Sequence, residues 1–149
     1  MKRLQIPYRS VLLEPRDLDP ADFDTVCLEN LEASRATPVV VEISSADIQY
    51  VLFLSEGQLY WVAANDGERT RAVPLRDFFA RLRRMQFPQI IAYRMDMVLF
   101  HSLLVWGQKK PELKVASTLV DLDELLDRVE KECANAVLTA RDQTTLIVL

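Results

Sequence analysis

Residues 38–64 read PVVVEISSADIQYVLFLSEGQLYWVAA, three apolar runs separated by two short polar breaks. Runs of β-branched and aromatic residues between turn-forming residues are typical of β-strands. The breaks are residues 44–47 and 55–58, and Gly57 in the second is suited to the positive φ of a tight hairpin turn. The pattern predicts a three-stranded antiparallel meander with strands at residues 39–43, 48–54 and 59–64.

Helical periodicity is found on both sides of this meander. Before it, Asp19 can cap a helix that begins at Pro20, and apolar residues follow at helical spacing: Phe23, Val26, Cys27 and Leu31. After it, one face of an amphipathic helix is formed by Leu75, Phe78, Phe79 and Leu82. This second helix should pack on one face of the meander.

Shorter signals predict three more elements. Alternating apolar residues at 4, 6 and 8 favour a strand, which Pro7 and Pro15 should interrupt. Residues 89–94 are typical of another strand. Asp96 can cap an apolar helix that Gly107 would end.

The carboxy-terminal third repeats the order of the beginning. Asp121-Leu122-Asp123 matches Asp17-Leu18-Asp19, and a helical pattern and two apolar runs at 137–140 and 145–149 follow. We therefore predict an α+β fold, with antiparallel meander sheets packed with amphipathic helices in two related helix–hairpin units, the second incomplete. Two generic units without duplication remain the alternative.

These patterns divide the chain into residues 1–107, the first helix–meander–helix unit with its following strand and apolar helix, and 108–149, the partial second unit. Packing of both units as one domain is the alternative. The second unit lacks a third strand and an arginine-rich helix. We expect either that more chain follows residue 149, or that the edge at residues 145–149 is covered or self-associates.

Composition argues against several classes of function. The 149 residues have a net charge of −4, which disfavours a nucleic-acid partner because such partners select basic surfaces. Only three glycines and one histidine are available for phosphate loops or His-based catalysis. His101 adjoins Ser102, but helix neighbours point about 100° apart and do not form a dyad. We expect no enzyme activity, no metal and no cofactor, and interpret His101 as a packing residue.

The cysteines and the apolar segments of the sequence indicate the cellular compartment. Cys27 and Cys133 are too few and too distant for a disulfide framework. The amino terminus has no apolar stretch of signal-peptide length, and the most apolar window, residues 95–106, is too short to span a bilayer. We expect a cytoplasmic protein without a membrane partner.

The most uneven charge is found in residues 69–84, with six arginines and one aspartate. Arginine forks suit acidic protein surfaces and phosphorylated ligands, although a solvated face paired with the acidic helix within residues 14–32 is the alternative. Tyr60 and Trp61 should point to opposite faces of their strand, one into the core and one available as an interface anchor. The candidate interaction surface is Arg69, Arg71, Arg76, Arg81, Arg83, Arg84, Tyr60 and Trp61.

Three stretches form a pattern of their own: ATPVVV at 36–41, SEGQLYWVA at 55–63 and LRDFFARL at 75–82. With the preceding helix they resemble the PATAN-type modules of bacterial signalling proteins over residues 17–83, and residues 121–149 resemble the first half of such a module. Pro38 replaces the small residue, typically Gly, that opens the first strand of the pattern. The resemblance implies an adaptor or regulatory role in bacterial signal transduction and supplies no catalytic residues.

The leading hypothesis is therefore a non-enzymatic regulatory or scaffolding module of a bacterial signalling protein that binds another protein. The alternative is a ligand-sensing domain in which the Arg69–Arg84 segment holds a nucleotide or another anion.

Overall fold

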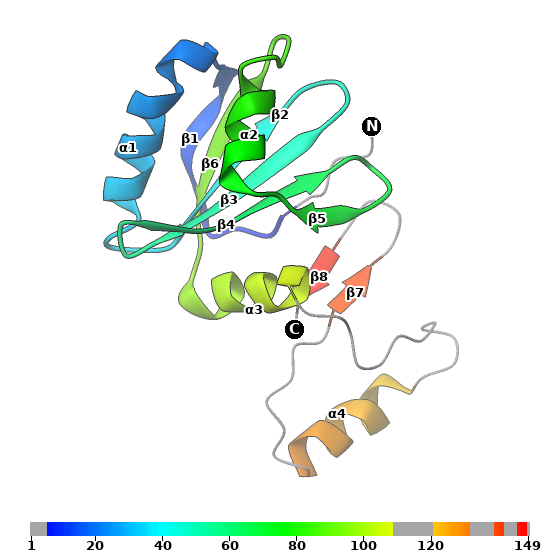
Figure 1. Ribbon diagram of the computed structural model, residues 1–149. Coiled ribbons are helices and arrows are strands. Elements are labelled where there is room, and N and C mark those ends of the chain that lie inside the picture. The colour runs from blue at the N-terminus through cyan, green and yellow to red at the C-terminus, as the bar shows by residue number, and fades with distance from the viewer. Residues whose placement is uncertain (1–5, 109–120, 132–138, 142–145, 149) are drawn as a thin grey trace.

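A six-stranded antiparallel sheet forms the centre of the computed structural model, which describes residues 6–108, 121–131, 139–141 and 146–148 (Figure 1). The strand order is β1-β6-β2-β3-β4-β5. Their bounds are β1 (Ser10–Asp17), β2 (Val39–Ser44), β3 (Gln49–Ser55), β4 (Gln58–Asn65), β5 (Thr70–Ala72) and β6 (Gln89–Arg94). With the helices that cover it, this sheet confirms the predicted α+β class.

The predicted meander is confirmed as β2, β3 and β4. The turn between β2 and β3 is closed by the Ser45 N–H, which donates to the Ile48 carbonyl at 2.9 Å. Between β3 and β4, Glu56 and Gly57 both have positive φ, 53° and 73°. Two successive positive φ values match the strand twist in a tight hairpin, and this is why glycine is used here.

Helices cover both faces of the sheet. α1 (Phe23–Ala33) and α2 (Leu75–Leu82) lie on one face, and α3 (Met97–Gln108) lies on the other (Figure 1). Every residue of β2 and β3 is buried. This two-sided burial is the physical reason why these strands are nearly continuous apolar runs rather than alternating ones.

Each face has an aromatic core. On the α1 and α2 side, the Phe78 ring makes edge contacts with Phe23 at 5.5 Å and Tyr50 at 5.2 Å between ring centroids. On the α3 side, Phe53 contacts Trp61 at 5.1 Å and Phe100 at 5.9 Å. Edge-to-face rings add to the burial of apolar area, so both cores hold the helices firmly on the sheet.

The helix starts follow the predicted capping. Asp19 accepts a hydrogen bond from the Ala21 N–H at 2.9 Å and begins a 3₁₀ turn, η1 (Pro20–Asp22), which continues into α1. Asp96 accepts from the Leu99 N–H at 2.8 Å at the start of α3. Side-chain acceptors at these positions satisfy backbone donors that a helix start leaves free.

The first strand was predicted wrongly. Residue 4 lies outside the described residues and residues 6–8 are not in a strand; β1 instead spans Pro15, with register shifts against β6 on both sides of Leu13. Proline is tolerated because β1 is an edge strand, where one side of the backbone needs no partner. The short strand β5, which pairs with β4 at the opposite edge, was not predicted at all.

Gly107 does not end its helix, because α3 continues to Gln108. Its role is close packing. A Cβ at this position would lie 2.0 Å from Cη2 of Trp61, so only a residue without a side chain lets the helix approach the β4 tryptophan this closely.

The carboxy-terminal part contains α4 (Leu122–Lys131) and an antiparallel pair, β7 (Thr139–Arg141) and β8 (Leu146–Val148). Asp121 accepts hydrogen bonds from the N–H groups of Asp123 at 3.0 Å and Glu124 at 3.3 Å. A helix followed by a hairpin is the predicted order. Residues 137, 138, 145 and 149 of the expected strands, and Cys133, lie outside the described residues, and the division into two related units stays a prediction.

In the described part of the chain, no helix has both the length and the apolar character required to cross a membrane.

Candidate functional site

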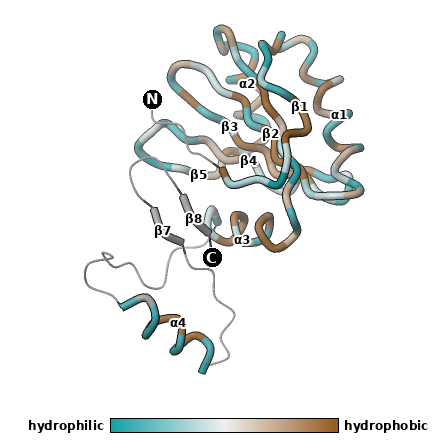
Figure 2. The backbone as a smooth tube through the Cα atoms, turned by 180° about the vertical axis from the view of Figure 1, so that it is seen from behind, coloured by the Kyte–Doolittle hydropathy of each residue, from teal (hydrophilic) through white to brown (hydrophobic). Residues whose placement is uncertain are grey.

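The outward side of α3 is an exposed apolar surface. Met97, Val98 and Val105 keep 43%, 77% and 41% of their surface accessible. Because successive residues of an α-helix are about 100° apart, these three residues and His101 share one side of α3, and the buried Phe100 and Leu103 lie on the other side. We call Met97, Val98, His101 and Val105 the α3 outer face; Figure 2 shows the apolar colouring of much of this helix.

His101 lies in this surface, and its predicted packing role was wrong in part. The side chain is exposed, although its ring is 5.8 Å from that of Phe100. An apolar helix is normally buried all round. Here the sheet covers only one side, which leaves the histidine on the open side among aliphatic neighbours.

Tyr60 and Trp61 do not divide between the two faces of the sheet as predicted. Phe53 pairs with Trp61 and Leu54 pairs with Leu59, so Tyr60 is the extra residue of a β-bulge. The bulge breaks the two-residue alternation and brings Tyr60 to the α3 side, where its ring lies 6.0 Å from Phe100. Trp61 is a core residue, 9% exposed, whereas Tyr60 stays 48% exposed beside α3.

The six arginines of residues 69–84 are all exposed, and they belong to two parts of the segment. Arg69 and Arg71 belong to the β4–β5 turn and β5, whereas Arg76, Arg81, Arg83 and Arg84 belong to α2 and the residues just after it. Arg81 and Arg84 alone among them line a common pocket.

Pairing between the acidic and the arginine-rich helix is not observed. The start of α1 touches α2, since Phe23 contacts Phe79 at 5.8 Å between ring centroids. Within the described residues no ion pair between α1 and α2 is found; the pairs Arg35–Glu32 at 2.8 Å and Arg69–Asp66 at 4.0 Å each join residues three apart in the chain. The α2 arginines therefore keep their charge available.

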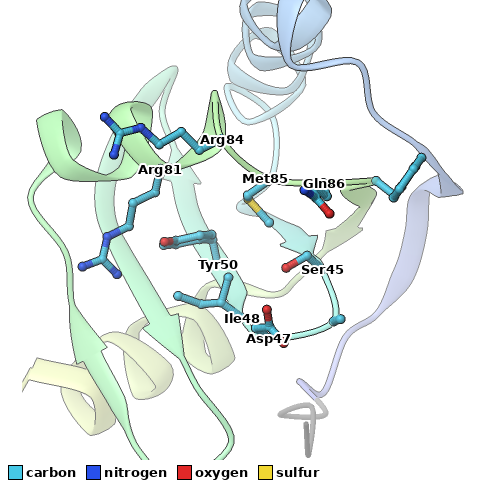
Figure 3. Close-up of a pocket in the computed structure, with 10 residues that line it drawn as sticks. Ser45, Asp47, Ile48, Tyr50, Arg81, Arg84, Met85 and Gln86 are labelled. Atoms are coloured by element: carbon cyan, nitrogen blue, oxygen red, sulfur yellow. The ribbon is translucent and has the colours of Figure 1, made fainter.

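A pocket of about 740 Å³ lies between the β2–β3 turn and the end of α2 (Figure 3). The turn contributes Ser45, Asp47 and Ile48, while the chain after α2 contributes Met85, Gln86 and Phe87. The other lining residues are Ala46, Tyr50, Arg81 and Arg84. In Figure 3 the two arginines occupy one side of the pocket and Asp47 the other, so its two ends differ in charge.

Tyr50 gives this pocket a buried polar group. The residue is fully buried, and its hydroxyl has no hydrogen-bond partner. Figure 3 shows the hydroxyl end of the ring on the side of Arg81. A buried hydroxyl without a partner costs free energy, and such groups require an explanation.

Two groups elsewhere have shifted pKa values. Burial, and secondarily the negative charge of Asp24, raises the pKa of the Cys27 thiol. Hydrogen bonds from the N–H groups of Arg69 and Glu68 lower the pKa of Asp66, and the same hydrogen bonds hold the turn before β5. Neither group lies in the pocket or on the α3 outer face, so both shifts have structural causes.

Within the ranges that the structure describes, no three or more His, Cys, Asp or Glu side chains gather in a way that could hold a metal ion. Sequence reasoning missed Met97, Val98, Val105 and Tyr50. The all-round apolar pattern of residues 97–106 was a signal for the first three, because a helix on a sheet surface cannot bury every side.

Comparisons of the chain with protein-family models, with curated proteins and with solved structures found no match.

Proposed function

We propose that this chain is a cytoplasmic, non-enzymatic regulatory or scaffolding module that acts by binding another protein. The observation that carries the proposal is the α3 outer face, where Met97, Val98 and Val105 are accessible on one side of one helix. Contiguous exposed apolar residues are typical of protein-interaction surfaces. The PATAN resemblance of residues 17–83 implies the same class of function and favours bacterial signalling.

The free energy available at this surface is sufficient for an interface anchor. Full burial of one Val or Met side chain is worth about 1.5–3 kcal/mol. Three such side chains, about half exposed, can therefore gain several kcal/mol from a partner, and the exposed Tyr60 ring beside α3 extends the area. Aromatic residues are enriched among the residues that dominate binding energy.

Rigid support makes the surface suitable for recognition. The opposite side of α3 is fixed by Phe100 and Leu103, which are 0% and 1% exposed in the second core. Asp96 caps the helix, and Gly107 lets it lie close to Trp61. A partner would thus meet an ordered helix and would not have to order it on binding.

The proposal is tested by affinity capture from bacterial lysate with the natural chain and with the double variant Val98→Glu/Val105→Glu. Light scattering on the same samples detects self-association. Leu28→Glu is the matched control, because Leu28 is 66% exposed on α1, away from α3. A protein retained by the natural chain and by Leu28→Glu, and lost from the double variant, is then purified and its affinity measured directly.

The expected result is a measurable affinity that falls at least tenfold in the double variant and is unchanged in Leu28→Glu. A chain that stays monomeric and retains no protein contradicts the proposal. Partners held equally by the natural chain and the double variant contradict the assignment to the α3 outer face.

A further inference from the structure

We infer that the pocket between the β2–β3 turn and the end of α2 binds a phosphate monoester of mononucleotide size. This site is separate from the proposed protein-binding surface. Tyr50 and Met85 belong to the core on the α1 and α2 side of the sheet, whereas the α3 outer face lies on the opposite side. The two sites can therefore be tested independently.

The cationic end of the pocket supports an anionic ligand. Arg81 and Arg84, three residues apart, both line it. In the described part of the chain no ion pair is found for either of them. Two guanidinium groups with free donors on one wall match the several acceptor oxygens of a phosphate better than a single carboxylate.

The hydroxyl of Tyr50 is an independent observation that points to a ligand. The side chain is fully buried, lines the pocket and has no hydrogen-bond partner for its hydroxyl. Phenylalanine would fill the same space without that cost. The hydroxyl is not accessible in the free protein, so a shift of the exposed Arg81 side chain, on whose side of the pocket it lies in Figure 3, would let a ligand oxygen held by Arg81 provide the missing acceptor.

The remaining walls suit the rest of a nucleotide. Ile48, Met85 and Phe87 form apolar walls, and Phe87 is 89% exposed with a φ of 47°. An aromatic side chain held open at the rim can stack on a planar base. Asp47, opposite the arginines, can accept hydrogen bonds from ribose hydroxyl or base amino groups but would repel a second phosphate.

The size of the pocket agrees with this ligand class. Its volume of about 740 Å³ lies within the range of about 300–1,000 Å³ that is typical of small-molecule sites. Inorganic phosphate alone would occupy only the arginine end and would leave the apolar walls empty. The inference therefore requires a base as well as a phosphate.

Isothermal titration calorimetry of the full chain with each of the four nucleoside 5′-monophosphates, with adenosine and with inorganic phosphate tests this inference. At least one monophosphate should bind, and at least about tenfold more tightly than adenosine or phosphate alone, since both halves contribute. No binding by any of the four at millimolar concentration overturns the inference. Equal affinity for inorganic phosphate overturns the requirement for a base.

Two variants with the same loss of charge separate the pocket from general electrostatic attraction. Arg81→Ala/Arg84→Ala should weaken binding at least about tenfold, while Arg76→Ala/Arg83→Ala, from the same segment but outside the pocket, should leave it unchanged. Equal weakening by both double variants overturns the site.

Tyr50→Phe supplies a readout that does not depend on charge. It should weaken binding several-fold while the melting temperature stays equal or rises, because the lost hydroxyl has no partner in the free protein. Unchanged affinity in this variant contradicts the role of Tyr50.

Discussion

Gly107→Ala should lower the free energy of unfolding, because the structure leaves no space for a methyl group at this position. The new methyl group would lie 2.0 Å from Cη2 and 2.3 Å from Cζ3 of Trp61, where ordinary contact begins at 3.4 Å. Either the indole or the end of α3 must move. Overpacking of this kind costs about 1–3 kcal/mol. Replacing glycine by alanine inside a helix otherwise gains about 1 kcal/mol.

The net expectation is a loss of up to about 2 kcal/mol in the free energy of unfolding. Urea titration followed by far-ultraviolet circular dichroism measures it without depending on Trp61 fluorescence. In a Trp61→Leu background the steric conflict is relieved, and the same alanine should stabilise by about 1 kcal/mol. Stabilisation by Gly107→Ala in both backgrounds would refute the close packing of α3 on β4.

Three further predictions follow from individual side chains. Phe78→Ala should lower the free energy of unfolding by about 3–5 kcal/mol because the ring is fully buried, and Phe79→Ala should lower it clearly less because Phe79 is half-buried. Equal losses for the two variants in urea titration would contradict this packing. Because the pKa of Asp66 is lowered in the folded protein, the carboxylate stabilises the turn fully above its ordinary pKa of 3.8, and this stabilisation is lost as pH falls through the lower folded pKa. Hydrogen exchange of the Glu68 and Arg69 amides should therefore lose protection in acid. Unchanged protection in acid would contradict this role of Asp66. Asp24→Asn should speed alkylation of Cys27 by iodoacetamide in a Cys133→Ser background, since removing the negative charge lowers the raised thiol pKa; an unchanged rate by mass spectrometry would contradict the effect of Asp24.

The meander was predictable because its signal is local and strong. Residues 39–64 combine apolar runs with turns whose chemistry can be read directly, including Gly57. The caps at Asp19 and Asp96 are equally local, since a side chain two or three residues before a free N–H is sufficient.

The errors come from contacts that sequence spacing does not contain. β1 includes Pro15 because β6, more than 70 residues later, leaves it at the edge of the sheet. A bulge in the pairing with β3 moves Tyr60 to the α3 side, and no feature of the strand itself predicts it.

The pocket required the tertiary structure. Tyr50 in β3 and Arg81 in α2 are separated by β4 and β5 in the chain, and they line the same pocket because α2 packs on the sheet through Phe78 and Tyr50. The arginine-rich segment was visible in the sequence, yet which of its members share a cavity was not. Gly107 shows the same limit, because a helix-ending glycine and a glycine that permits close packing have the same local sequence.

Site-specific photo-crosslinking tests the central claim, that α3 presents the binding surface, most directly. One variant of the chain has a benzophenone amino acid at position 98 and another has it at position 28. The natural residues at both positions, Val98 and Leu28, are exposed and apolar. We predict that position 98 forms a discrete crosslink to a partner or to a second copy of the chain and that position 28 does not. Crosslinking at position 28 alone, equally at both, or at neither would contradict the claim.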